Sequence, residues 1–150
     1  LLVAWRIADN ATSVSFKSAA NATGAFATIL NYGHAFSSTG SPVVAHAAAQ
    51  SSSGTASATF TPPANVTTTA TAARAISIVA VRANNPLSLS SAAGYTVRGA
   101  INQIVGSGSS AISLAIADTV VQTSGSTPTA PTWAQSGTAA QWASGLVAFS

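Results

Sequence analysis

The side chains that could carry out acid, base or metal chemistry are few in this chain. Among its 150 residues the acids are Asp9 and Asp118, the histidines are His34 and His46, and cysteine is absent. A pair of carboxylates for glycoside hydrolysis would have to be Asp9 with Asp118. Each follows an apolar run in a turn-forming context. We therefore expect both to be turn residues.

Metal binding and nucleophilic catalysis are not favoured by the other residues. The histidines show neither the HxxxH nor the HxH spacing that brings two imidazoles to one metal ion. A Ser, His, Asp set exists by count, but the chain has no GxSxG turn, and the glycine-containing run at 106–110 lacks the lysine of a phosphate-binding loop. We expect a protein that is not an enzyme, with no catalytic residues, no bound metal and no cofactor.

Aromatic side chains offer a second kind of site, because flat rings bind carbohydrate without charge. The chain contains Trp5, Trp133, Trp142, Tyr32 and Tyr95. Of these, Trp133, Trp142 and Tyr32 are the candidates for a glycan-binding platform. The alternative is that the rings fill the core and its rim, where an apolar body and a polar tip are both accommodated. We favour the core, because most of the rings lie within alternating strand patterns.

The composition argues against nucleic acid as a partner and in favour of self-association. Charged residues make up 5% of the chain, against about 25% in a typical soluble domain. The five cations are never adjacent, whereas a nucleic-acid surface needs clustered Lys and Arg. Weakly charged molecules repel one another little. We therefore expect the protein to pack against copies of itself in an assembly.

The stretch from Arg74 to Arg82, RAISIVAVR, predicts the central strand of the domain. Its even-numbered residues from 76 to 80 point to one face and its odd-numbered residues from 77 to 81 to the other, and both sets are largely apolar. Such a strand is covered on both sides. It is too short to cross a membrane, which takes about 20 apolar residues, and we expect no membrane span.

Short alternating patterns separated by turn residues continue along the chain. The predicted strands cover residues 1–7, 11–17, 25–36, 55–61, 66–71, 74–82, 94–101, 111–117 and 142–149, with a further strand at Trp133. No stretch has sustained helical periodicity. About ten short strands predict an all-β fold, and we favour an antiparallel β-sandwich of the jelly-roll-like kind over a barrel. Residues 1–150 form one such domain.

Several segments are expected to lie outside strands or are left open. The run 43–49, VVAHAAA, is a loop or a strand, since it is too short to hold a helix without tertiary help. Residues 50–55 have the composition of a hairpin linker, and 83–93 that of a polar loop whose two leucines cover an open end of the core. The strand 111–117 is expected to be half-buried. Because Leu1 stands inside an apolar run, we expect the chain to be a fragment of a longer one.

Six segments along the chain carry a resemblance to a known family. They are LLVAW, NYGHAF, TTTATAARAISIVAVRA, GYTVRG, SLAIADTVVQTSG and PTWAQSGTAAQWASGLVAF. Their order resembles a β-sandwich domain of tailed-bacteriophage virion proteins and of related bacterial surface or prophage proteins. In that domain a threonine-rich strand runs into an apolar one, a Gly-aromatic-x-x-Arg-Gly strand follows, and a tryptophan hairpin closes the fold. Tyr95 stands where the family usually carries tryptophan.

The resemblance implies a non-enzymatic structural or adhesive module, displayed on a capsid, a tail or a fibre as a decoration or fibre component. Its expected location is the virion surface or the space outside the cell, and its expected partners are copies of itself and other virion proteins. The family brings no catalytic residues. The competing hypothesis is a carbohydrate-binding or adhesion module that recognises a host or cell-surface glycan through Trp133, Trp142 or Tyr32. A bacterial surface-layer or adhesin domain is a third possibility, which composition does not separate from the first.

Overall fold

A computed structural model gives the architecture of the chain. It describes residues 15, 43–50, 57–61, 66–67, 73–91, 94–98, 103–105, 107, 111–121 and 129–149. The described residues form strands, turns and connecting segments and contain no helix, so the prediction of an all-β protein is confirmed. The predicted strands 1–7, 11–17 and 25–36 lie outside the described residues, apart from Ser15.

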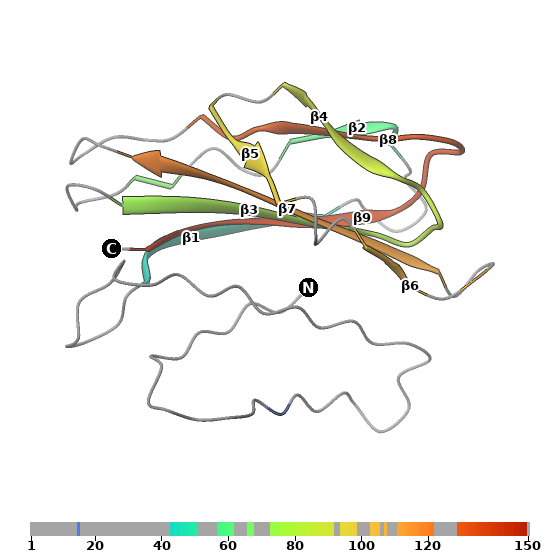
Figure 1. Ribbon diagram of the computed structural model, residues 1–150, viewed down its shortest axis with the longest axis horizontal. Helices are drawn as coiled ribbons and strands as arrows, with labels where there is room; N and C mark the ends of the chain where they lie inside the picture. The colour runs from blue at the N-terminus through green and yellow to red at the C-terminus, as the bar shows by residue number, and fades with distance from the viewer. Residues whose placement is uncertain are drawn as a thin grey trace.

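The described residues form nine strands, which lie in two antiparallel sheets. They are β1 (Val43–Gln50), β2 (Thr59–Phe60), β3 (Ala73–Val81), β4 (Leu87–Ser91), β5 (Thr96–Val97), β6 (Gln103–Val105), β7 (Ile112–Val121), β8 (Thr132–Gln135) and β9 (Trp142–Phe149). The larger sheet has the order β1-β9-β3-β7-β5, with β6 also paired to β7, and the smaller sheet has the order β2-β8-β4. In Figure 1 the smaller sheet lies above the larger one.

The pairing between strands is nested along the chain. The first described strand pairs with the last, β1 with β9; β2 then pairs with β8, and β3 with β7. Successive pairs alternate between the larger and the smaller sheet. A long antiparallel ribbon folded over in this way is the pattern of a jelly roll. The arrangement is therefore consistent with the predicted jelly-roll-like sandwich.

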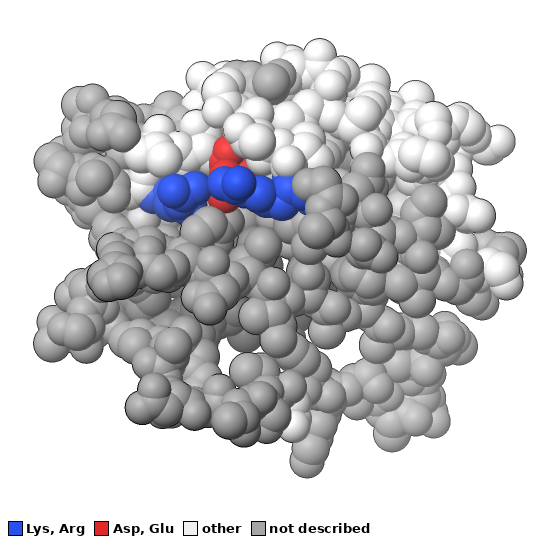
Figure 2. All heavy atoms as spheres, in the orientation of Figure 1, with Lys and Arg blue, Asp and Glu red and all other residues white. Residues whose placement is uncertain are grey.

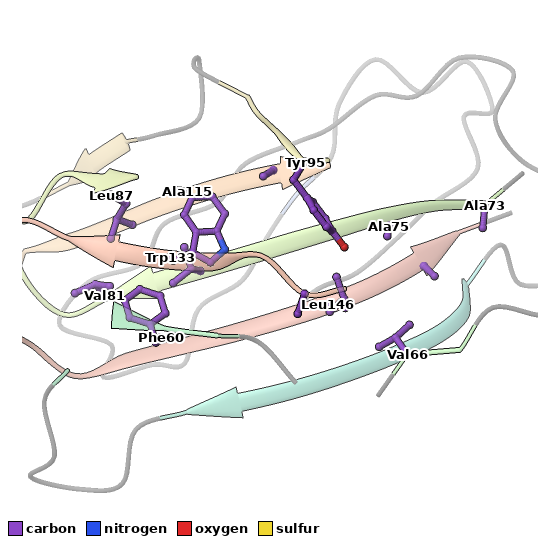
Figure 3. Packing of buried hydrophobic residues seen from close by; sticks show 14 residues of the cluster. Phe60, Val66, Ala73, Ala75, Val81, Leu87, Tyr95, Ala115, Trp133 and Leu146 are labelled. Carbon is purple, nitrogen blue, oxygen red and sulfur yellow. The ribbon is translucent and has the colours of Figure 1, made fainter. Parts of the chain in front are cut away.

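The core between the two sheets combines large residues from one sheet with small residues from the other. The smaller sheet contributes Phe60, Leu87 and Trp133, and the facing side of the larger sheet contributes mainly alanine, valine and serine. Figure 3 shows the rings of Trp133, Phe60 and Tyr95 lying over this face. Large side chains opposite small ones allow two sheets to interdigitate without voids.

The strand β3 confirms the prediction of a central strand covered on both sides. It is hydrogen-bonded to β7 along one edge and to β9 along the other. Ala75, Val79 and Val81 belong to the core between the sheets, whereas Ile76 and Ile78 belong to a second buried cluster. That second cluster contains residues of the larger sheet alone among those described, and it lies on the face turned away from the smaller sheet. We call the two sides of the larger sheet its inner and outer faces.

Three local predictions can be compared with the pairing. The run 43–49 is a strand, one of the two alternatives expected for it. The linker expected at 50–55 lies outside the described residues apart from Gln50, and the strands before and after it, β1 and β2, belong to different sheets. The segment 83–93 was expected to be a loop, but Leu87–Ser91 pairs with β8. The strand 111–117 is not half-buried, since its alanines and its large residues are covered on opposite faces.

The remaining strand predictions differ mainly in length. Within the strands expected at 94–101 and 55–61, the described residues form the two-residue strands β5 and β2. The last strands, at Trp133 and at 142–149, are confirmed. A search for long apolar helices that could cross a bilayer finds none among the described residues.

Candidate functional site

Asp118, expected to be a turn residue, lies within strand β7. It sits opposite Ile76 of β3 and opposite Thr96 of β5, on the outer face of the larger sheet. Its side chain is 2% exposed. The prediction of a turn is wrong for a physical reason: a carboxylate is tolerated inside a strand when opposite charges compensate its burial.

Two arginines from other strands supply that compensation. Arg74 Nη1 of β3 lies 3.2 Å from Asp118 Oδ2. From the residue after β5, Arg98 donates through Nε to the same oxygen at 3.0 Å and through Nη2 to Oδ1. This two-pronged contact matches the fork of a guanidinium to the two oxygens of a carboxylate. We call Arg74, Arg98 and Asp118 the Asp118 cluster.

The Asp118 cluster extends from the buried outer face of the larger sheet to the molecular surface. The carboxylate is buried, whereas the side chains of Arg74 and Arg98 are 28% and 42% exposed. Figure 2 shows arginine or lysine atoms, in blue, side by side with acidic atoms, in red, on the visible face. With two cations around one anion, the cluster carries a surplus of one positive charge.

The chemistry available to the Asp118 cluster is electrostatic. Arginine does not give up its proton in proteins, so neither partner can exchange a proton with the carboxylate. The strands β3, β5 and β7 are instead tied together across the outer face by charge-assisted hydrogen bonds. This geometry fits a structural role, in which the three side chains hold strands β3, β5 and β7 together on the side of the sheet where β5 lies.

Of the other candidate residues for acid, base or metal chemistry, His46 is the one that the structure describes, and it does not join this cluster. His46 lies in β1 with its side chain exposed, across the sheet from Asp118. Asp9 and His34 lie outside the described residues. In the described part of the chain no three His, Cys, Asp or Glu side chains come together in a way that could hold a metal ion.

Two of the three aromatic candidates for a glycan platform, Trp133 and Trp142, are described, and both pack into the core cluster between the sheets. Trp133 is 0% exposed, and its indole N–H donates to Ser77 Oγ of β3 at 2.9 Å. A ring enclosed between two sheets is not available for stacking on a sugar. Trp142 is partly buried and stacks on Phe60, with ring centroids 4.9 Å apart. Tyr32 lies outside the described residues.

Tyr95 is also a core residue. It is 5% exposed, and its hydroxyl has no hydrogen-bond partner within the described part of the chain. Burial raises the pKa of the Tyr95 phenol to about 12, because the apolar surroundings disfavour the charged form. The ring therefore acts as a neutral filler of the core.

A neutral polar network, not anticipated from the sequence, links the two sheets to the segments that connect them. Asn85 Nδ2 donates to Gln135 Oε1 at 2.6 Å and to the carbonyl of Thr138 at 2.8 Å. The backbone N–H of Asn85 donates to Ser113 Oγ of β7, and Gln135 Nε2 donates to the carbonyl of Ala140. The segment that connects β3 to β4 is thus bonded through Asn85 to Ser113 of the larger sheet and to Gln135 of the smaller one. A glutamine in the apolar run PTWAQ was the only sequence signal of this network.

The chain was compared with models of known protein families, with curated proteins and with solved structures, and nothing matches it. A functional assignment therefore rests on the chain's own residues and on the pattern of its strands.

Proposed function

We propose that this chain is a non-enzymatic structural module of a bacteriophage particle, displayed on its surface as a capsid decoration, tail or fibre domain. In this role copies of the chain pack against one another or against other virion proteins. The observation that carries the proposal is the nested pairing β1–β9, β2–β8 and β3–β7. Jelly rolls of this kind recur in viral capsid domains. The weak charge of the chain, 5% charged residues, supports dense packing of like modules.

Because one fold serves many functions, the proposal needs a direct test. Particles are purified by density from the source material, and the peptides of this chain are quantified by mass spectrometry relative to the major capsid protein. We expect the peptides to travel with the particles. A copy number comparable with that of the capsid protein indicates a decoration role, and a much lower one indicates a tail or fibre.

Surface display is tested on the same particles. Brief protease treatment of intact particles should remove peptides of this chain while internal virion proteins persist. The particle-free fractions of the same gradient serve as the control. Peptides found in those fractions and absent from the particles would overturn the proposal.

A carbohydrate-binding module is the second candidate, because lectin domains also use jelly rolls and Trp142 remains partly exposed. If the chain binds a cell-surface glycan, Trp142→Ala should abolish binding to a glycan array while Trp142→Phe retains part of it, since a smaller ring still stacks. The melting temperature of each variant is measured alongside. Equal binding by wild type and Trp142→Ala would remove Trp142 from this hypothesis.

A further inference from the structure

The outer face of the larger sheet is buried, although its apolar cluster contains side chains of that sheet alone among the described residues. We call this group, which includes Ile76, Ile116 and Val147, the outer cluster. These three side chains are 3%, 1% and 6% exposed. A sheet face without a second layer is solvated, so the outer cluster is covered. The values hold for a single chain, and the cover is therefore part of the chain itself.

The covering part of the chain must be long enough to spread over three neighbouring strands, β9, β3 and β7. After Val43 the stretches that the structure does not describe are short, the longest between two strands being 122–128. Connections of this length run between the ends of strands. Before Val43 the chain has 42 residues, of which Ser15 alone is described. Val43 itself packs against the outer cluster, so the residues before it meet the sheet beside that face.

The first 17 residues have the pattern of strands that are apolar on one side. Residues 1–7, LLVAWRI, place a large apolar residue at every odd position, and residues 13–16, SVSF, alternate serine with Val14 and Phe16. Ser15 is exposed. In an extended chain the two neighbours of an exposed residue point to the opposite side, which directs Val14 and Phe16 toward the protein. Such an apolar side has to be buried against another element.

We propose that residues 1–17 dock on the outer face of the larger sheet, with their apolar side against the outer cluster. Seven extended residues span about 23 Å, and neighbouring strands lie about 4.8 Å apart, so each of the two predicted strands can cross β9, β3 and β7. The inference goes beyond the proposed function and does not depend on it. Its consequence for an assembly is that the outer face is closed to other proteins, which must contact the molecule elsewhere.

A photo-reactive residue in the full chain tests this placement. Phe16→p-benzoylphenylalanine should form cross-links within one chain to peptides of β3, β7 or β9, identified by mass spectrometry. The same residue at the exposed Ser15 should form none to these strands. Gel electrophoresis separates cross-links within a chain from those between chains. Cross-links from position 16 that reach only the smaller sheet, that join only separate chains, or that do not form would each overturn the inference.

Thiol labelling gives a second test, because the chain has no native cysteine. Two buried residues of β9 report on opposite faces of the sheet. Val147→Cys reports on the outer face, and Ser144→Cys reports on the inner face, since Ser144 lies opposite Val79 of the core between the sheets. Both substitutions nearly preserve the size of the side chain. Both thiols should be labelled slowly in the otherwise unchanged chain.

Two matched double substitutions are then added to each reporter. Trp5→Glu/Phe16→Glu puts two carboxylates on the apolar side of the segment, and Ala4→Glu/Ser15→Glu puts them on the other side. Because a carboxylate is costly to bury, the first pair should release the segment and raise the labelling rate at position 147 at least tenfold, with no change at 144. The second pair should change neither rate. An unchanged rate at 147, or equal rises at 144 and 147, would overturn the inference.

Discussion

The two faces of the larger sheet accommodate polar groups by opposite means. The inner face and its margins contain neutral groups: Ser77 accepts from Trp133, and Asn85 and Gln135 bond to each other and to backbone carbonyls. The outer face contains ions, in the Asp118 cluster. Among the buried polar residues that the structure describes, Asp118 is the one charged residue, and it lies on the outer face.

The difference follows from the distance to water. Between the sheets a charge would lose its hydration and gain no compensating interaction. Neutral donors and acceptors that bond to one another therefore cost less free energy to bury there. At the outer face the arginine side chains keep 28% and 42% of their surface exposed, and the guanidinium groups hold the carboxylate at the boundary. We therefore expect substitutions at the inner face to lower the free energy of unfolding through lost packing and hydrogen bonds, by an amount that does not depend on salt. Substitutions at the outer face should act through charge, by an amount that does depend on salt.

The largest expected effect concerns the inner face. Trp133→Ala should lower the free energy of unfolding by about 4 kcal/mol, because it removes a fully enclosed ring and leaves a cavity between the sheets. It also removes the donor to Ser77 Oγ. Urea denaturation followed by circular dichroism measures the change. Trp142→Ala, at a partly buried ring, should cost clearly less, and equal losses for the two variants would contradict the assignment of Trp133 to the core.

The neutral network should produce the next largest effect. Asn85→Ala should cost about 3 kcal/mol, since it leaves Gln135 Oε1 and the carbonyl of Thr138 without the donors they have now. Asn84→Ala is the matched control, because the neighbouring asparagine is exposed. The loss should be the same at low and high salt. A loss that shrinks strongly with added salt would show that the inner face is not neutral.

These two regions also differ in how far the sequence predicts them. The inner and outer residues of β3 follow from strict alternation, and Trp133 from its place in an alternating strand. The burial of Asp118 within a strand could not be predicted from the sequence. The two arginines that contact it come from β3 and from the residue after β5, and a single sequence does not show which strands pair. Leu87–Ser91 was misjudged for a similar reason. Its serines resemble a loop until pairing with β8 is known.

High pH should destabilise the core between the sheets through one group, the phenol of Tyr95. Below about pH 10 the Tyr95 phenol is neutral in both the folded and the unfolded chain. Above that it ionises first in the unfolded chain, because burial raises its pKa in the fold to about 12. The free energy of unfolding should therefore fall between about pH 10 and 12, by roughly 3 kcal/mol in total. Tyr95→Phe should remove this loss.

At neutral pH the same substitution should be harmless or mildly stabilising, because the hydroxyl of Tyr95 has no hydrogen-bond partner among the described residues. Parallel denaturation series for wild type and Tyr95→Phe measure both effects. If the two proteins lose stability equally as the pH rises, then the phenol of Tyr95 is not the group that titrates.

The smallest of these effects belongs to the outer face and depends on salt. Asp118→Asn keeps the shape of the side chain but leaves two arginines without their carboxylate, and should cost about 2 kcal/mol at low salt. We place the value below the usual range for buried pairs because both arginines are partly exposed. Since an asparagine also leaves like charges close together, added salt should weaken their repulsion and reduce the difference from wild type. Arg82→Gln, at an exposed arginine one residue beyond β3, is the control and should change little at any salt concentration. If Asp118→Asn and Arg82→Gln behave alike, the outer face is not held by charge, and the contrast between the two faces of the sheet fails.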